Sequence, residues 1–550
     1  MSRGRDVFIV SAKRTAFGTF GGKLKGKNAT ELAELAARAA LNAASIDPQH
    51  IDHVIFGNVV QSSKCAAYLS RHVLLRVGIP IEKPAVTINR LCGSGFEAIT
   101  QGAQQIIAGD SEVVLAGGTE NMSQHPYVVR QGRFGIPLGA NVEFEDVLWS
   151  LLTDQYTKIP MGLTAEKLGA KYGVTRQETD AFALASQTRW KHANNAGYFK
   201  AEIEPLKLKT RKGEETFEVD EHPRETTAES LAKLPPVFQK DGLVTAGNAS
   251  GISDGAAAAV VASAEAVQKY KLQPLARLVD WRAVGCDPTI MGIGPVGAVE
   301  WILKKHKLTF DNIDLVEVNE AFAPQVLAVQ KALNIPSEKL NVNGGAIALG
   351  HPLAASGARI TAHLCHELHR RNGKYAIGSA CIGGGQGIAV LLEKLQNSTY
   401  FRSCWLFSPS LTTLERSKLL SGVAKFVYFE IAAIGGCYGV FVLCRRNEPV
   451  RRFLHDNFPR TLELYYKSED LISVSPPKMG FFGRLWSRFL NHRITQHQSK
   501  YYQKFAACVV ISATYYWYLT IKENRDVRRP MSELSFQKYV ELRKELGKDV

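Results

Sequence analysis

The stretch that decides the fold is residues 51–58, IDHVIFGN, because it recurs 262 positions later as residues 313–320, IDLVEVNE. At the same offset, VVLAGG of residues 113–118 matches YAIGSA of residues 375–380. A serine-glycine pair also recurs, as Ser94-Gly95 and Ser356-Gly357. One constant offset across about 70 residues indicates two copies of one unit, and it is far longer than a solenoid period.

Both copies alternate short apolar runs with helical stretches, as in DVFIVSA followed by TELAELAARAALNAA. Such alternation predicts buried sheets covered by helices, which is an α/β layered fold. Residues 121–248 have no counterpart in the other copy and are rich in charge, so we expect an inserted substrate-binding loop domain. The predicted division is an N-terminal unit of residues 1–120 and 249–270, the loop domain 121–248, a C-terminal unit 271–395 and an extension 396–550.

The composition of the 550-residue chain, 45% hydrophobic and 22% charged, is typical of a folded protein. Most of the net charge of +15 lies in residues 396–550, which hold 24 Lys or Arg against 13 Asp or Glu. Residues 1–395 are therefore close to neutral, and we expect no nucleic-acid partner. The nine cysteines contain no CxxC pair, which favours a reducing compartment and argues against a disulfide scaffold or a zinc site.

The segment AVTINRLCGSGFEAI, residues 85–99, places Cys92 in a turn between a β-rich run and a helix. Gly93 and Gly95 permit a tight turn, and the helical pattern begins near Phe96. Free N–H groups and the dipole at a helix N-terminus favour the thiolate form of a cysteine. A lone cysteine is more often a buried structural residue, so the prediction depends on what surrounds it.

The second copy supplies those surroundings. His351 occupies the position of Asn89, and Cys381 that of Thr119, each at the 262-residue offset. Duplicated units packed about a pseudo-twofold axis bring equivalent turns together, so we expect Cys92, His351 and Cys381 in one site. A thiol nucleophile, an imidazole base and a second thiol suit acyl transfer with carbanion chemistry. Taken singly, each second-copy residue also fits an ordinary role, a helix-capping histidine or a small buried cysteine.

Four motifs in order, NRLCGSGFEAI, VNEAFAP, NVNGGAIALGHP and CIGGGQG, resemble the signatures of the thiolase family. The likeness runs from Asp6 to about Leu395, and it looks strongest to members that act on 3-ketoacyl-CoA in mitochondria. It implies the thiolase fold, two duplicated α/β units in an αβαβα layered arrangement with an inserted loop domain. The activity implied is reversible, CoA-dependent cleavage of 3-ketoacyl-CoA to acetyl-CoA in fatty acid β-oxidation. The alternative within the family is a biosynthetic thiolase that forms acetoacetyl-CoA.

The resemblance also implies catalytic roles. Cys92 would attack the 3-keto group, His351 would accept the proton of Cys92, and Cys381 would protonate the leaving carbanion and then deprotonate CoA. Asn319 would hold a water that forms one oxyanion hole with His351. The backbone N–H groups of Cys92 and Gly383 would form the other, and such donors are worth about 3–4 kcal/mol each.

Further implied contacts lie outside the catalytic turns. Arg224, Thr226 and Ser250 match positions that bind CoA, and Met161 and Phe322 match positions along the acyl end. CoA is a co-substrate, with no metal and no permanently bound cofactor expected. The resemblance implies a homo-oligomer, a dimer or a tetramer.

Two departures from the family pattern are Ala354 in GHPLAASGAR, where relatives usually carry glycine, and Lys167 in TAEK. If position 354 needs φ > 0, the alanine costs about 1 kcal/mol. Two rival readings are a ketoacyl synthase, which lacks the second catalytic cysteine, and a non-catalytic lipid carrier. The joint presence of Cys92, Asn319, His351 and Cys381 argues against the carrier.

The extension, residues 396–550, has no place in the thiolase pattern. Its apolar stretches 426–444 and 505–521 are candidate membrane helices, with a small basic helical domain as the alternative. A membrane-tethered scaffold fusion is therefore a further hypothesis for the whole chain. Basic residues after the first stretch favour that side facing the matrix, which would place the thiolase part away from its substrates. We expect a mitochondrial protein, with the thiolase part in the matrix and the inner membrane involved only if the extension belongs to it.

Overall fold

The computed structural model describes residues 5–210 and 213–395. No helix within these ranges is long and apolar enough to cross a membrane. The two candidate membrane helices, 426–444 and 505–521, and the rest of the predicted extension lie outside the described residues.

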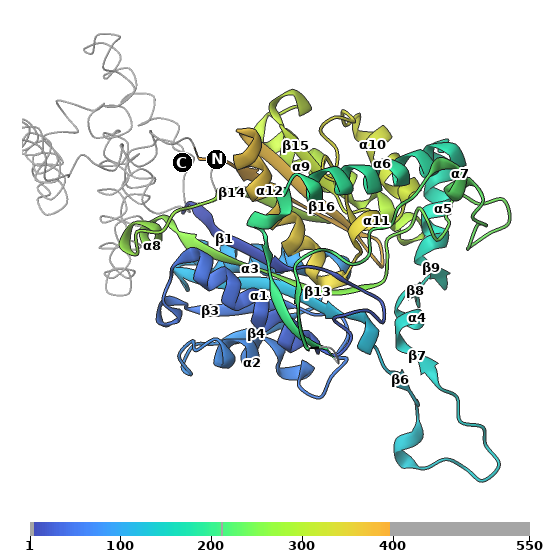
Figure 1. Cartoon of the computed structure of the whole chain (residues 1–550), viewed down its shortest axis with the longest axis horizontal. Coiled ribbons are helices and arrows are strands. Elements are labelled where there is room, and N and C mark those ends of the chain that lie inside the picture. Colours follow the sequence, from blue (N-terminus) through green and yellow to red (C-terminus); the bar gives the residue numbers. More distant parts are fainter. Residues whose placement is uncertain (1–4, 211–212, 396–550) are drawn as a thin grey trace, which may run out of the picture. The chain divides into compact units, whose positions relative to one another are not determined.

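One mixed sheet of 11 strands forms the frame, and it consists of two similar halves (Figure 1). The first half has the order β1-β13-β5-β3-β4, and the second has the order β14-β17-β16-β15. The halves join where Phe8 and Ile9 of β1 pair antiparallel with Arg277 and Ala276 of β14. The strands of the first half are β1 (Val7–Thr15), β3 (His53–Gly57), β4 (Ala85–Ile88), β5 (Val113–Asn121) and β13 (Ser253–Ser263). Those of the second half are β14 (Ala276–Gly285), β15 (Leu315–Val318), β16 (Tyr375–Ile382) and β17 (Gln386–Glu393); the short β2 (Gly18–Thr19) pairs with β13 and β10 (Ile203–Glu204) with β1.

The predicted duplication is confirmed down to strand register. In the first copy β3 pairs parallel with β5, with His53 opposite Val114. In the second copy β15 pairs parallel with β16, with Leu315 opposite Ala376, and both partners are displaced by 262 residues. The helices α3 (Ser94–Ala108) and α12 (Ser356–Arg371) begin at the same offset. Where the first copy has β4, the second has a short helix, α11 (Ala346–Leu349).

The halves and their helices stack as alternating layers (Figure 1). One apolar core lies between the first half-sheet and the outer helices α1 (Ala29–Ala44) and α2 (Leu69–Arg76). Another lies between the second half-sheet and α9 (Gly294–His306) and α10 (Ala323–Leu333). The central core surrounds α3 and α12, which lie between the half-sheets. This position explains why α12 is buried along most of its length rather than on one face.

The chain between β5 and β13 forms an extended excursion from this core (Figure 1). Its first part is a projecting arm, residues 126–146, whose base is the two-stranded pair of β6 and β7. Buried ion pairs fix the later part, because Arg14 of β1 bonds both Glu202 and Asp220. The elements are β6 (Tyr127–Val128), β7 (Glu145–Asp146), α4 (Val147–Leu151), β8 (Thr153–Asp154), β9 (Ile159–Pro160), α5 (Met161–Lys171), α6 (Arg176–Asn195), β11 (Leu206–Thr210), β12 (Gly213–Phe217) and α7 (Ala228–Ala232); α8 (Ala264–Lys269) follows β13.

Candidate active site

The turn that carries Cys92 is a single 3₁₀ turn, Leu91–Gly93, directly before α3. Leu91 has φ of 46°, a left-handed conformation that is uncommon for leucine. Asn89 supports it: its side-chain oxygen accepts a hydrogen bond from Leu91 N at 2.9 Å, and its amide nitrogen donates to Val59 O. The turn also packs tightly on the second copy, because a Cβ on Gly93 would lie 2.6 Å from Ile382 Cδ1.

The Cys92 thiol is not predisposed to ionise. Burial raises its pKa to about 11, and the charge of Glu120 adds to this, whereas hydrogen bonds from the backbone of Gly383 and of Cys92 itself oppose it. The expectation that the helix N-terminus favours a thiolate is therefore wrong for the resting site, because desolvation outweighs the backbone donors. A nucleophilic Cys92 needs a base.

The base predicted from the sequence is His351. It is buried, and burial, followed by the charge of Arg359, lowers its pKa to about 3, so the imidazole is neutral at ordinary pH. Its Nε2 lies 3.4 Å from Asn319 Nδ2, and its Nδ1 lies 2.6 Å from Ser356 Oγ. Asn319 Oδ1 is buried and has no hydrogen-bond partner in the described part of the chain, so it could accept a hydrogen bond from a water.

Cys381 lies near the end of β16 and is buried. Burial raises the pKa of its thiol well above the ordinary value, and the neighbouring Cys92 and Cys286 thiols add to the effect. The packing around it is apolar: Met291 and Ala321 contact it, and Met161 and Phe322 pack against the same cluster. The structure thus brings both predicted thiols and the two predicted acyl-end residues into one region.

The sequence-predicted CoA positions lie in two places. Ser250 lies beside the catalytic turns, because its N–H donates to Ala321 O at 3.0 Å and its neighbour Ala249 pairs with Phe322. Arg224 and Thr226 lie on the segment before α7, with Arg224 exposed and Thr226 Oγ1 donating to Arg224 O at 3.3 Å. An exposed guanidinium next to a hydroxyl suits a phosphate-bearing ligand.

Two neighbours of the site were not predicted. Ser356 bonds His351, and its relation to Ser94 through the repeat is a signal that could have found it. Phe238 meets Phe322 edge to face at 6.4 Å between ring centres, and it occupies the space that a Cβ on Gly162 would need. Nothing in the local sequence points to Phe238, since only the folded excursion places it there.

Neither departure from the family pattern has a positive φ in the structure. Ala354 lies in a 3₁₀ turn, Leu353–Ala355, and does not adopt a positive φ, so the expected strain is absent. The backbone of Ala354 instead lies close to Gly118 of β5. That position requires glycine, because a Cβ there would lie 1.8 Å from Ala354 O. Lys167 is exposed on α5 and points away from the buried face of that helix.

Comparison with known proteins identifies the family of this chain. The thiolase N-terminal domain matches residues 7–265, and the thiolase C-terminal domain matches residues 272–394. The mitochondrial 3-ketoacyl-CoA thiolase of Bos taurus is 63% identical over 390 residues, covering 71% of this chain and 98% of that protein. An acetyl-CoA acetyltransferase of Syntrophomonas wolfei is 45% identical over 397 residues, covering 71% of this chain and all of that protein (100%). The crystal structure of human mitochondrial 3-ketoacyl-CoA thiolase in complex with CoA matches with a TM-score of 0.70 at 59% identity, covering 72% of this chain and 99% of that one. The chain belongs to the thiolase family.

Proposed function

We propose that this chain is a 3-ketoacyl-CoA thiolase, an acyltransferase that cleaves 3-ketoacyl-CoA with CoA into acetyl-CoA and a shortened acyl-CoA in fatty acid β-oxidation. The observation that carries the proposal is the meeting of the Cys92 turn of one copy with the Cys381–Gly383 hairpin of the other, where Gly383 N–H reaches the Cys92 sulfur. Identity of 63% to a mitochondrial 3-ketoacyl-CoA thiolase, against 45% to an acetyl-CoA acetyltransferase, favours the degradative activity over the biosynthetic alternative.

The proposed chemistry begins with His351. Its neutral Nε2 takes the proton of Cys92 while the sulfur attacks the 3-keto carbon, and the bond between the α-carbon and that carbon then breaks. Cys381 protonates the acetyl-CoA carbanion, and acyl-Cys92 remains. CoA then gives its thiol proton to Cys381 and attacks the acyl group, and the Cys92 sulfur regains its proton from His351. Charge on the substrate oxygens is stabilised by the Cys92 and Gly383 N–H groups and by His351 with an Asn319-bound water.

High pKa values for both thiols support this assignment of roles. A thiol that stays protonated is a competent acid for a carbanion, which is the role we give Cys381. The apolar cluster of Met161, Phe322 and Met291 supports an acyl chain beside Cys381. We assign the CoA portion to Arg224 and Thr226 on the excursion 121–248, which we keep as the proposed CoA-binding domain, and to Ser250 just after it.

The experiment is an assay of the purified full chain with CoA and 3-ketoacyl-CoAs of short, medium and long chain length. Loss of 3-ketoacyl-CoA should match formation of acetyl-CoA one to one. Activity only with acetoacetyl-CoA would favour the biosynthetic alternative. The absence of turnover with every substrate, in a folded preparation that binds CoA, would contradict the proposal.

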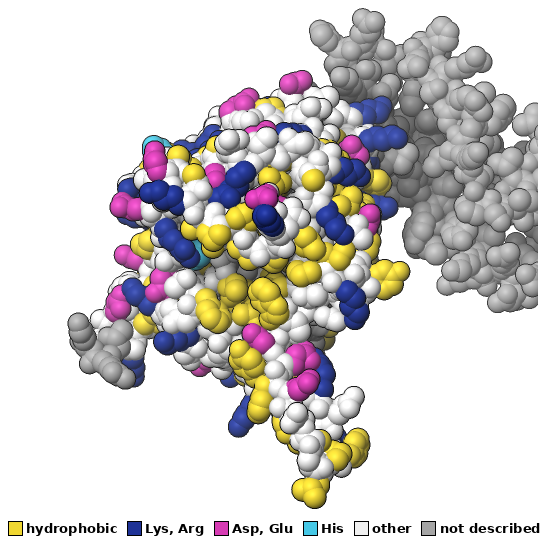
Figure 2. Space-filling view, turned by 90° about the vertical axis from the view of Figure 1, so that its right-hand side faces the viewer, with side chains coloured by type: hydrophobic (Ala, Val, Ile, Leu, Met, Phe, Trp, Pro, Cys, Tyr) yellow, Lys and Arg dark blue, Asp and Glu magenta, His cyan; other side chains and the backbone are white. Residues whose placement is uncertain are grey.

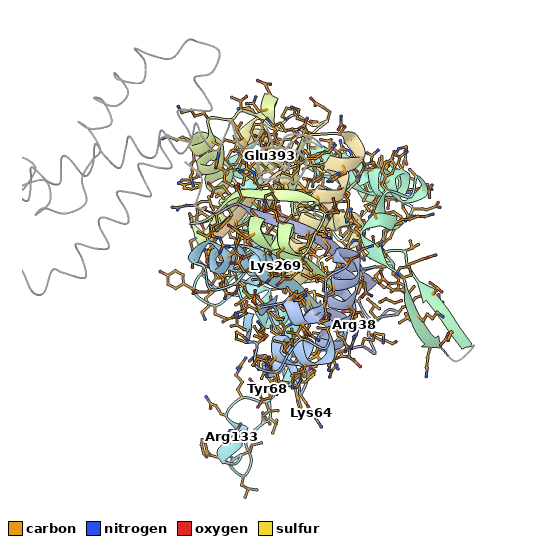
Figure 3. The ribbon with its side chains drawn as sticks, turned by 90° about the vertical axis from the view of Figure 1, so that its left-hand side faces the viewer. Arg38, Lys64, Tyr68, Arg133, Lys269 and Glu393 are labelled. Carbon is orange, nitrogen blue, oxygen red and sulfur yellow. The ribbon has the colours of Figure 1, made fainter. Side chains whose placement is uncertain are left out.

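We also propose that the protein is a homo-oligomer, with a second copy covering the projecting arm, residues 126–146. Phe134 and Leu138 on this arm are 96% and 106% exposed, and Tyr127 and Phe144 are exposed as well. Figure 2 shows hydrophobic side chains gathered at the tip of the arm, and Figure 3 shows Arg133 on it, well beyond Tyr68 and Lys64. So much apolar surface on a thin projection is typical of an interface. Light scattering should give a dimer or larger, and a smaller particle for the double variant Phe134→Ser, Leu138→Ser.

The proposal also covers the cellular compartment of the protein and the role of the extension, residues 396–550. The mitochondrial relatives favour a mitochondrial location for this chain. A membrane-tethered scaffold built on residues 396–550 remains the second hypothesis, carried only by the two apolar stretches of that segment. Fractionation of mitochondria with an antibody to the thiolase part separates the two: recovery in the soluble matrix fraction contradicts tethering, and recovery in the membrane pellet after carbonate washing supports it.

A further inference from the structure

Each nitrogen of the His351 imidazole has a different neighbour. Ser356, the first residue of α12, is fully buried, and its Oγ lies 2.6 Å from Nδ1. On the other side, Asn319 Nδ2 lies 3.4 Å from Nε2. Both neighbours belong to buried, well-packed turns, so the ring has little freedom to change partners.

These neighbours select one tautomer. A neutral imidazole carries a single N–H, and an amide nitrogen is only a donor, so the nitrogen that faces Asn319 presents its lone pair. The N–H is then on Nδ1 and donates to Ser356 Oγ. A hydroxyl oxygen is a suitable acceptor for it. In this tautomer Nε2 is the unprotonated nitrogen, so it is the one that could take a proton from a thiol.

The serine at this position of the repeat has different hydrogen-bond partners in the two copies. In the first copy, Ser94 stands at the equivalent place, and its hydroxyl donates to Leu91 O at 2.6 Å and accepts from Arg90 N at 2.9 Å. That serine caps its own turn. In the second copy, Ser356 bonds the imidazole that replaces Asn89.

A second histidine in the same molecule shows what a different partner does. His363 lies on α12, and its Nδ1 is 2.9 Å from Glu202 Oε2. Burial lowers the pKa of His363, but the carboxylate outweighs this effect and holds the pKa above its ordinary value. A carboxylate beside His351 would likewise stabilise the imidazolium and retain the proton. The uncharged hydroxyl of Ser356 orients the ring without doing so.

We propose that Ser356 is a positioning residue that holds His351 in the Nδ1–H tautomer, so that Nε2 can take the Cys92 proton and later return it. This rests on the proposed function, and it adds a residue to which no role has been given above. In the step, the S–H bond of Cys92 breaks, an N–H bond forms at Nε2, and the sulfur electron pair forms the bond to the 3-keto carbon. The Nδ1–H bond to Ser356 stays in place throughout, and the Nε2 proton goes back to Cys92 when the acyl group leaves.

The test compares Ser356→Ala with Ser356→Thr in the full chain. The readouts are the single-turnover rate of acyl-Cys92 formation, followed by mass spectrometry, and the rate at which iodoacetamide alkylates Cys92. We expect Ser356→Ala to slow both by about tenfold or more at nearly unchanged KM, since part of a general-base contribution is lost. Ser356→Thr keeps a hydroxyl and should recover most of both rates.

The matched control is Ser11→Ala. Ser11 is buried, and its hydroxyl donates to Ala40 O at 2.6 Å on the far side of β1 from the site. It should lose thermal stability while both Cys92 rates per folded site stay near wild type. Wild-type rates in Ser356→Ala, or a Thr variant no faster than the Ala variant, would overturn the proposal. If Ser356→Ala does not fold, Ser356→Cys against Ser356→Thr decides in the same way, because a thiol is a weak acceptor of similar size.

Failure of the proposed function would look different. It would appear as a folded wild-type chain that forms no acyl-enzyme and cleaves no 3-ketoacyl-CoA, or as acyl-enzyme formation in Cys92→Ala, whatever the Ser356 variants do.

Discussion

The two copies of the unit share strand register and helix starts, yet their equivalent turns do different things. Cys92 in the first copy corresponds to Ala354 in the second at the 262-residue offset. The first turn holds Leu91 in a left-handed conformation and leaves Cys92 partly exposed. The second turn has no such residue, and Ala354 is fully buried, with its carbonyl against Gly118. Of these two turns, only the one that carries the proposed nucleophile holds a residue in a strained conformation, and the other is used for packing.

The proposed catalytic roles are also divided between the two copies. The first copy supplies the proposed nucleophile, and the second supplies His351, Cys381 and Asn319. A duplication of one scaffold therefore made a site that neither copy contains alone. Because of the repeat, each proposed functional residue can be compared with the residue at the equivalent position of the other copy.

The largest effect should come from the nucleophile. Cys92→Ala should abolish thiolysis and acyl-enzyme formation, a fall of roughly 10⁴-fold or more. Cys381→Ala should still form some acyl-enzyme, because Cys92 and His351 remain, while turnover falls. Mass spectrometry of the chain after incubation with labelled acetoacetyl-CoA distinguishes the two. Normal turnover in Cys92→Ala would remove the basis for assigning the copies different roles.

The packing contact between the copies gives the next largest effect. Gly118→Ala should lower the free energy of unfolding by about 3 kcal/mol or more, because its Cβ would lie 1.8 Å from a backbone oxygen that cannot move aside. Its counterpart in the second copy is already alanine, Ala380. Gly378→Ala is the matched control, since its Cβ meets only side-chain atoms at 3.0 Å or more. Thermal unfolding should rank the two variants in that order; equal midpoints would contradict it.

Lowering the pH should reduce the stability of the folded protein through His351, whereas its counterpart in the first copy, Asn89, does not titrate. The folded protein holds the pKa of His351 at about 3, against 6.5 ordinarily, so below about pH 6.5 the unfolded chain binds a proton that the folded chain does not. Stability should therefore fall as the pH drops from about 6.5 toward 3, by about 2 kcal/mol at pH 5 for this one group. His222, whose pKa burial lowers to about 4, acts in the same direction.

The control for this acid effect is His351→Asn, which copies the first unit. Its thermal midpoint should fall less between neutral pH and about pH 5 than that of the wild type. His363 acts in the opposite sense in both proteins, because its raised pKa gives stability that is present below pH 6.5 and is lost as the pH rises through its folded value. An equal fall in the variant and the wild type would show that His351 is not the group responsible.

The smallest effect should come from restoring the family glycine. Ala354→Gly relieves no strain, because Ala354 has no positive φ, and it adds backbone freedom to the unfolded chain. We expect a loss of about 0.5–1 kcal/mol and unchanged turnover. Thermal unfolding beside an activity assay measures both. A clear gain in stability would mean that the second turn is strained like the first.

The sequence by itself determined the duplication, and through it which strands and turns of the two copies are equivalent and the candidate trio of Cys92, His351 and Cys381. Local patterns suffice for this, because the repeat fixes which strands and turns are equivalent. The sequence misjudged one local property, the thiolate state of Cys92, and left another open, the strain at Ala354. Both depend on desolvation and backbone conformation rather than on residue type.

Only the tertiary structure decided which groups face one another. Phe238 reaches Phe322, and Glu202 meets Arg14 and His363, across chain separations that no local pattern spans. Ser356 is only five residues from His351, but which imidazole nitrogen it faces depends on how the turn packs. The physical reason is that pKa values and tautomers are set by burial and by the partner atoms within hydrogen-bond distance. Those partners come from the packing of the two copies against each other and against the excursion between β5 and β13.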